Sequence, residues 1–257
     1  MNSKARILIK KKNKKKIVCL TAYSKNIGLF IDKYCDLILV GDSMANVIYG
    51  MKNTHKIDLS TIANHAKAVR LGVKKSLLVI DMPKGSYPNS NLAKKNAKKL
   101  LKQTRCDAVK IENNSSNLNI IRTLYKSGIN VMGHIGYTPQ FKKKFKIEGQ
   151  TLKQEIKLIN QAKQIESAGA FAIVLECISK KAAQKITKSI KIPTIGIGSS
   201  SECDGQILVT EDILGISGFY PKFVKKYLNL EKLIKKAVKK FSNDVKSGKF
   251  PSKKNSF

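Results

Sequence analysis

Four acidic residues follow short apolar runs at equivalent places along the chain. Asp42 comes after LILVG, Asp81 ends LLVID, Glu112 ends AVKIE and Glu176 ends FAIVLE. When strands alternate with helices, the strands run parallel and their carboxyl ends gather catalytic groups on one face. Only 17 Asp and Glu stand against 50 Lys and Arg. The set therefore favours an enzyme site over the alternative, in which each acid merely caps the next helix.

Three of these carboxylates, Asp42, Asp81 and Glu112, would repel one another at one point unless a hard cation lay among them. Oxygen ligands without clustered His or Cys favour magnesium over zinc. The three histidines of the chain show no zinc-binding spacing. We therefore predict a magnesium site rather than a zinc site.

Other polar residues on the same runs suit an anionic substrate. Lys110 and Glu112 alternate along one run, so both side chains lie on one face of that strand. A metal ion and a lysine together would hold an anion. Glu176 comes from another strand and is the free carboxylate, which makes it the candidate general base. His134 either donates a hydrogen bond to the substrate or is a satisfied buried histidine.

The elements that must position these residues are eight apolar runs separated by helical spacing. This alternation predicts an α/β protein, and eight units in this length favour a (β/α)8 TIM barrel over a doubly wound open sheet. Gly72, Gly128 and Gly169 are expected to end helices in the left-handed conformation. The predicted strands are residues 17–21, 37–40, 77–81, 108–112, 130–134, 171–176, 193–198 and 213–217.

We expect one domain over residues 1–257, with a basic N-terminal segment at 1–16 and an amphipathic helix and tail at about 227–257. Core or subunit packing is the commoner use of such a helix, and membrane docking is the alternative. The segment GIGSSS at 196–201 fits either a phosphate or polar-ligand contact or a tight turn.

The formal charge of +33 raises the alternative of a polyanion-binding protein. Only four of the 50 basic residues are arginines, and the lysines are spread over most helical segments, so we expect no specific nucleic-acid partner. No apolar run is long enough for a bilayer or a signal peptide, and the five cysteines have no C-x-x-C spacing. We expect a cytoplasmic protein with reduced cysteines.

Seven motifs in order carry a resemblance that covers about residues 15–253. The chain closely resembles the ketopantoate hydroxymethyltransferase family. The motifs are GDSMANVIYG, MPKGSY, VKIE, GHIGYTPQ, VLEC, IPTIGIGSSSECDGQILV and PKFVKKY.

The resemblance implies transfer of a one-carbon unit from 5,10-methylenetetrahydrofolate to 3-methyl-2-oxobutanoate, which gives 2-dehydropantoate for pantothenate synthesis. It implies one Mg2+ per subunit and a magnesium-stabilised enolate. It further implies small-molecule substrates and a cytoplasmic homo-oligomer, often a decamer.

The resemblance also assigns roles to residues of this chain. Glu176 matches the proposed base that removes the C3 proton of the oxoacid. The metal site corresponds to Asp42, Asp81 and Glu112, and the substrate-binding positions correspond to Asp42, Ser43, Asp81, Lys110 and His134.

Two other classes of protein stay open. One is a different metal-dependent barrel enzyme that acts on an oxoacid, such as a lyase of the phosphoenolpyruvate/pyruvate group, which would need no folate. The other is a noncatalytic polyanion-binding protein, which steep salt-dependent DNA affinity would reveal.

Overall fold

The computed structural model describes residues 1–113, 117–142 and 144–257. The chain forms two compact units, residues 1–209 and residues 210–257. The boundary after Val209 lies before the position of about 227 at which we expected the C-terminal segment to begin. The single-domain organisation stays a prediction.

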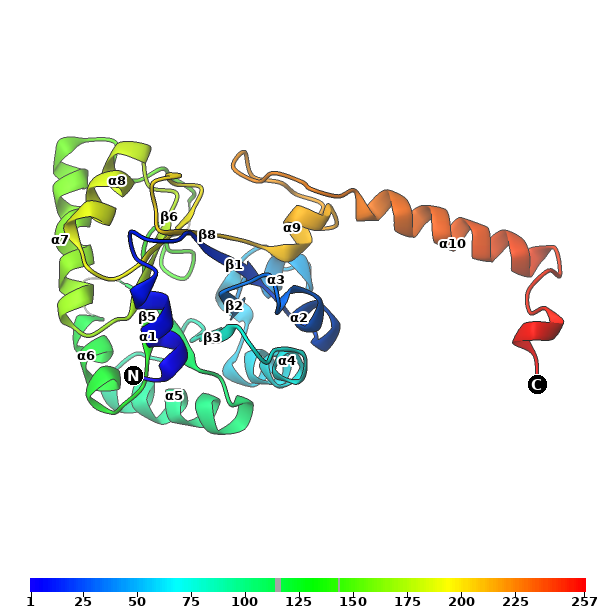
Figure 1. Cartoon of the computed structure of the whole chain (residues 1–257), viewed down its shortest axis with the longest axis horizontal. Coiled ribbons are helices and arrows are strands. Elements are labelled where there is room, and N and C mark those ends of the chain that lie inside the picture. Colours follow the sequence, from blue (N-terminus) through cyan, green and yellow to red (C-terminus); the bar gives the residue numbers. More distant parts are fainter. Residues whose placement is uncertain (114–116, 143) are drawn as a thin grey trace. The chain divides into compact units, whose positions relative to one another are not determined.

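The first unit is a closed barrel of eight parallel strands, with helices on its outer side (Figure 1). Each strand pairs with the next, and β8 pairs with β1 through Ile17 opposite Gly205. Closure confirms the (β/α)8 barrel and rules out the open sheet. The strands are β1 Ile17–Thr21, β2 Leu37–Val40, β3 Leu77–Asp81, β4 Ala108–Glu112, β5 Val131–Gly136, β6 Ala172–Glu176, β7 Thr194–Ile197 and β8 Gly205–Leu208.

The outer helices begin where the sequence offers an N-cap side chain. Asp58 accepts the backbone N–H of Thr61 at 2.7 Å, and Asn89 accepts that of Leu92 at 2.9 Å. The helical elements of this unit are α1 Ser3–Lys10, α2 Lys25–Ile31, α3 Met44–Val47, η1 Thr54–Lys56, α4 Leu59–Gly72, α5 Ser90–Thr104, α6 Leu118–Lys126, α7 Leu152–Ser167 and α8 Lys180–Ser189.

The predicted eighth strand at 213–217 is wrong. Strand β8 is Gly205–Leu208, and of the run that we expected to be extended, Ile213 and Leu214 belong to helix α9, Thr210–Leu214, while residues 215–217 follow it outside any strand. Strands β7 and β8 are joined by turns at 198–204 without an intervening helix. Because β8 is short and flanked by polar residues, the more apolar ILGIS run was mistaken for it.

Two of the three glycines predicted to end helices in the left-handed conformation do so. Gly128 and Gly169 have φ of 78° and 99°. Gly72 is different, because it is the last residue of α4 and its φ is not positive. A Cβ there would lie 2.2 Å from the carbonyl oxygen of Lys25, so the glycine allows α2 to pack closely against α4.

Apolar side chains fill the inside of the barrel, and the N-terminal segment closes one end of it. Leu37, Val79 and Met132 belong to the same buried cluster as Ala5 and Leu8 of α1. The N-terminal residues 1–16, expected only as a basic segment, thus supply part of the core.

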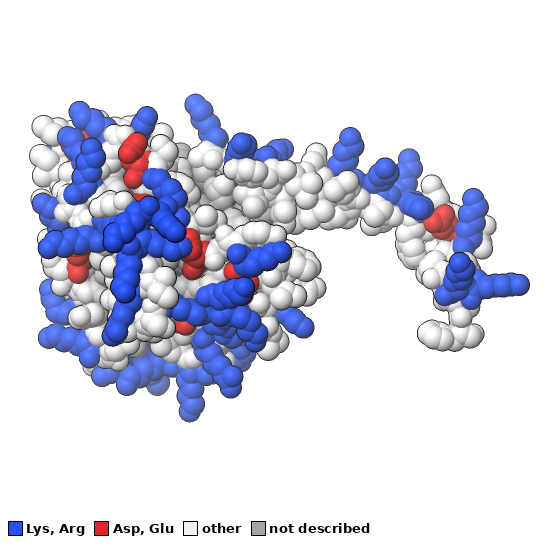
Figure 2. All heavy atoms as spheres, in the orientation of Figure 1, with Lys and Arg blue, Asp and Glu red and all other residues white. Residues whose placement is uncertain are grey.

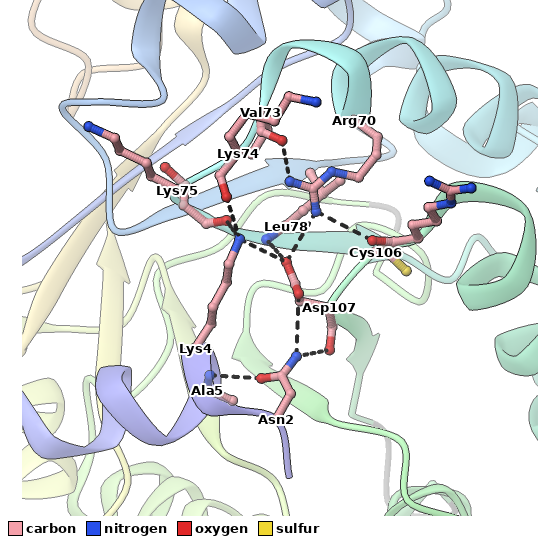
Figure 3. A network of polar contacts seen from close by, with 12 residues as sticks. Asn2, Lys4, Ala5, Arg70, Val73, Lys74, Lys75, Leu78, Cys106 and Asp107 are labelled. Carbon is pink, nitrogen blue, oxygen red and sulfur yellow. Dashed lines mark hydrogen bonds and ion pairs between the residues drawn. The ribbon is translucent and has the colours of Figure 1, made fainter.

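Polar contacts hold α1 in place around Asp107 (Figure 3). The Asn2 side-chain amide donates to the Asp107 carbonyl at 3.1 Å, and Lys4 Nζ donates to the Lys74 and Ser76 carbonyls at 2.9 Å each. Leu78 N–H donates to Asp107 Oδ2 at 2.9 Å, so one aspartate ties α1 to the start of β3.

The second unit contains α9, α10 (Leu230–Lys246) and η2 (Lys253–Asn255). Helix α10 confirms the predicted C-terminal helix, and none of its residues is buried. Across residues 1–113, 117–142 and 144–257, no helix is long and apolar enough to span a bilayer. All five cysteines are buried and unpaired.

Lysine and arginine side chains are scattered over the face visible in Figure 2, and acidic side chains appear there only in small groups. This distribution agrees with the sequence, in which basic residues recur along most helices rather than in one block.

Candidate active site

The predicted acids lie at the carboxyl ends of neighbouring barrel strands. Asp81 ends β3, Glu112 ends β4 and Glu176 ends β6, while Asp42 follows β2. His134 lies inside β5, which runs on to Gly136, so our expectation that it ends its strand is wrong. The barrel register places Glu112 opposite His134 and Gly136 opposite Glu176.

Two aspartates and a lysine form the most buried part of the site. Asp42 N–H donates to Asp81 Oδ2 at 3.0 Å, and Lys110 Nζ lies 2.9 Å from Asp81 Oδ1. Burial favours a neutral Lys110, but the surrounding carboxylates of Asp81, Glu112 and Asp42 outweigh it and raise the pKa of the amine. Lys110 is therefore a fixed cation at the inner end of the site.

When no metal is bound, the carboxyl groups of Asp42 and Glu112 keep their protons to a higher pH than ordinary carboxyl groups do. Burial and the neighbouring Asp81 raise the pKa of Asp42 from 3.8 to about 7. Burial and Asp42 raise the pKa of Glu112 well above its usual range. The cause in each case is a desolvated carboxylate beside another, which a bound cation would relieve.

His134 links the lysine to the predicted base. Its Nδ1 lies 3.3 Å from Lys110 Nζ, and its Nε2 lies 3.2 Å from Glu176 Oε2. Burial and Lys110 lower the pKa of His134 well below its usual range, so the ring is neutral. Nε2 is buried without a hydrogen bond of good geometry to any described atom. It could therefore donate to a bound ligand, and this role of His134 stays a prediction.

Glu176 is the acid with access to a substrate. Its side chain is 19% exposed, against 1% for Glu112 and 3% for Asp81. Burial raises the pKa of Glu176 to about 7. A carboxyl with that pKa can take up a proton and release it near neutral pH, which is the property a general base needs.

Two residues of the site were not identified from the sequence. Gln140, on the loop after β5, donates from its side chain to Asp42 Oδ2 at 2.8 Å and from its backbone to Glu112 Oε2 at 3.0 Å. Tyr87 donates to Gln140 Oε1 at 2.5 Å. Gln140 stands in the motif GHIGYTPQ, but an uncharged loop residue gives no sign of its partners until the chain is folded.

Ser43, predicted to bind the substrate, follows Asp42 at the start of α3. Its hydroxyl lies 2.8 Å from that of Tyr23, which is a further contact that the sequence did not indicate. Ser43 makes no side-chain cap to α3. The Ser43 hydroxyl is therefore part of a polar wall beside the carboxylates.

The donor set suits a magnesium ion better than a transition metal. It consists of carboxylate oxygens. Burial and the neighbouring Asp81 raise the pKa of Asp42 in spite of the opposing charge of Lys110, and a divalent cation would offset that repulsion. In the part of the chain that the structure describes, no three His, Cys, Asp or Glu side chains form a ready metal cage. Glu112 instead accepts from Gln140, so its direct contact with a metal stays a prediction.

Solved structures of other enzymes share the fold. Phosphonopyruvate hydrolase, crystallised with oxalate and Mg2+, has a TM-score of 0.62 and 12% sequence identity over 99% of this chain and 93% of that chain. A 2,3-dimethylmalate lyase of the PEP mutase/isocitrate lyase superfamily gives 0.60 and 12% identity over 100% and 93%. At such identities the likeness establishes the barrel and nothing about the reaction.

Curated relatives are far closer in sequence. The 3-methyl-2-oxobutanoate hydroxymethyltransferase of Pelagibacter ubique (strain HTCC1062) is 50% identical over the whole of both chains. The enzyme of the same name from Anaplasma marginale (strain Florida) is 46% identical over 94% of this chain and 88% of its own. That from Helicobacter pylori (strain Shi470) is 42% identical over 96% and 93%.

The family model of ketopantoate hydroxymethyltransferase matches residues 3–253, which includes all eight strands and the site described above. Its relatives are transferases, and the same motifs that suggested the family in the sequence surround the acids at the barrel mouth. The chain belongs to the ketopantoate hydroxymethyltransferase family.

Proposed function

We propose that this enzyme transfers a hydroxymethyl group from 5,10-methylenetetrahydrofolate to 3-methyl-2-oxobutanoate to give 2-dehydropantoate. The observation that carries the proposal is the row Lys110, His134 and Glu176 beside two aspartates, within a chain of this family. Removal of a proton from the carbon beside a carbonyl requires a cation, a neutral hydrogen-bond donor and a base whose pKa lies near 7.

Asp42 and Asp81 would hold the Mg2+, with Glu112 close by. When bound, the ion would supply Lewis-acid polarisation of the oxoacid oxygens. Lys110 lies against Asp81 and would attract the carboxylate of the oxoacid, and the Ser43 hydroxyl would donate to the same group. These contacts orient the substrate so that its C3 faces Glu176.

Glu176 takes the C3 proton in the next step, while the neutral His134 donates from Nε2 to the bound oxoacid. The methylene carbon of the folate is bonded to two nitrogens, and both of these bonds break. One breaks as the electron pair left on C3 forms the new carbon–carbon bond, and the other breaks as a water supplies the hydroxyl of the product. The proton held by Glu176 and the proton left from the water go to the two nitrogens, which releases tetrahydrofolate and returns Glu176 to its ionised form.

The expected assembly and location are part of the same proposal. The apolar side chains Leu233, Val238 and Phe241 of α10 are each at least half exposed. Such a stripe supports packing against another copy of the chain, as expected for a homo-oligomer. The unpaired buried cysteines are in keeping with a cytoplasmic protein.

An assay with purified protein tests the reaction. We expect 2-dehydropantoate, detected by NMR, only when 3-methyl-2-oxobutanoate, methylenetetrahydrofolate and Mg2+ are all present. Cleavage of an oxoacid without any need for folate would contradict the proposal and support the lyase alternative.

A further inference from the structure

The loop between β5 and α7 carries aromatic rings and lysines on its surface. Phe141 is 41% exposed and Phe145 is 60% exposed, and the lysines that flank Phe145 are exposed as well. Single exposed rings are common on protein surfaces, but rings that lie close together beside an active site can form a contact surface. We call the following residues the loop rim: Tyr137, Phe141, Lys144, Phe145 and Lys146.

One end of the loop rim adjoins the candidate base. Tyr137 N–H donates to the carbonyl oxygen of Glu176 at 2.8 Å. The rings of Tyr137 and Phe145 meet edge to face, with centroids 5.4 Å apart. Tyr137 therefore contacts Phe145 through its ring and Glu176, the candidate base, through its backbone.

The other end adjoins the aspartate pair. The Phe141 ring lies edge-on to that of Tyr87, with centroids 6.5 Å apart. Tyr87 donates to Gln140, which in turn donates to Asp42. The loop rim thus borders both the base and the proposed metal carboxylates.

The charges of the loop rim are not neutralised within the chain. Lys142 pairs with Glu148 at 2.5 Å. Lys144 and Lys146, by contrast, have no hydrogen-bond or ion-pair partner among the described residues. Two free cations beside exposed rings suit a ligand that has a flat ring system and an anionic tail.

A hollow continues from this loop. A cavity of about 390 Å3 is lined by Gly149, Thr151, Ser179 and Lys181, among others. Glu148 N–H donates to the carbonyl of Cys177, and Ser179 N–H donates to that of Glu148. The loop and the segment that follows Glu176 therefore lie side by side next to this cavity.

We propose that the loop rim binds the folate co-substrate, with Phe141 and Phe145 against its pterin and benzoyl rings and Lys144 and Lys146 against the carboxylates of its glutamate tail. The inference rests on the proposed function, which requires the one-carbon donor to approach C3 of the oxoacid. Because the oxoacid would be held between the aspartates and Glu176, the donor must enter from the mouth, where the loop rim lies.

The ring contact is tested by binding of 5-formyltetrahydrofolate to the full-length protein with Mg2+ and oxoacid present. Phe145→Ala should raise the Kd about fivefold, and Phe145→Tyr should restore it, because the ring is what binds. Phe30→Ala is the matched control, since Phe30 on α2 is 63% exposed and away from the loop rim in sequence. A Phe145→Ala Kd equal to that of the wild type would overturn the assignment.

The lysine contacts are tested with the double variant Lys144→Ala/Lys146→Ala. We expect a Kd about threefold higher in low salt, with the difference lost at high salt. 5-Formyltetrahydropteroate, which lacks the glutamate, should bind the variant and the wild type equally. The control is Lys95→Ala/Lys98→Ala on α5, and an equal loss in that control would overturn the specific role of the loop rim.

Failure of this inference can be told apart from failure of the proposed function. If the wild type forms no 2-dehydropantoate, the proposed function fails. If the wild type forms product and the Phe145→Ala protein binds folate normally, only the loop rim assignment fails. A Phe145→Ala protein that dissociates into smaller oligomers while its folate Kd is unchanged would show that the loop rim is a subunit contact and would also overturn the proposal.

Discussion

Replacing Asp42 with asparagine should stabilise the metal-free protein at pH 8. Asparagine has nearly the same shape and can keep the hydrogen bond from Gln140, and Asp81 remains as the partner of Lys110. The change removes only the ionised carboxylate that burial and Asp81 disfavour. The ionised Asp42 lowers the stability of the metal-free wild type, but the same carboxylate is expected to hold the metal.

The size of the effect follows from the pKa. A carboxyl whose pKa rises from 3.8 to about 7 costs ~4 kcal/mol when it ionises in the folded state, at about 1.36 kcal/mol per pKa unit. The pKa of Asp42 in the folded state lies above its value of 3.8 in the unfolded state. The stability of the folded protein that depends on a protonated Asp42 is therefore fully present below pH 3.8 and is lost as the pH rises through about 7. Because the pKa of about 7 already includes the attraction to Lys110, we expect a gain of up to about 4 kcal/mol at pH 8.

Urea unfolding at pH 5 and pH 8 measures this difference. The advantage of Asp42→Asn over the wild type should be larger at pH 8, whereas the control Glu202→Gln, on an exposed side chain, should change stability little at either pH. Added Mg2+ should stabilise the wild type by about 2.7 kcal/mol at one hundred times its Kd, and the variant by less. A variant that is less stable than the wild type at pH 8 without metal would refute the reasoning.

Three further substitutions test other parts of the account. Gln140→Leu should weaken Mg2+ binding about 10–100-fold, measured by magnesium titration of thermal stability, because it no longer orients the carboxylates. Lys12→Met should cost about 3–5 kcal/mol in urea unfolding, because it leaves Asp204 as a buried charge without the Nζ that now lies 2.8 Å away. Gly169→Ala should cost on the order of 2 kcal/mol in the same assay, since its φ is 99° and its Cβ would lie 2.3 Å from Tyr125 Cγ.

The sequence predicted those parts of the fold that follow from local patterns. Seven strands and the acids that end them were found because buried parallel strands are continuous apolar runs with polar residues at their ends. Strand β8 was not predicted from the sequence, because only Gly205 and Ile207 of its four residues are buried and it forms no continuous apolar run. The run at 213–217 is more apolar, yet its first two residues end helix α9 and none of it is a strand.

The parts that could not be predicted depend on contacts between distant segments. Gln140 reaches Asp42 from another strand's loop, and Lys12 pairs with Asp204 across almost the whole sequence. Ala5 and Leu8 are surrounded by basic residues in the sequence, which hid their role in the barrel core. No local spacing signals such contacts, because only the closed barrel brings the partners together.

Hydrogen–deuterium exchange at C3 of 3-methyl-2-oxobutanoate, followed by NMR without folate, tests the central claim most directly. With Mg2+ present, the wild type should exchange the proton, with a rate that rises with pH as Glu176 ionises and then levels off. Glu176→Gln should bind the oxoacid but exchange its C3 proton no faster than free solution. Undiminished exchange by Glu176→Gln would contradict the assignment of Glu176 as the base.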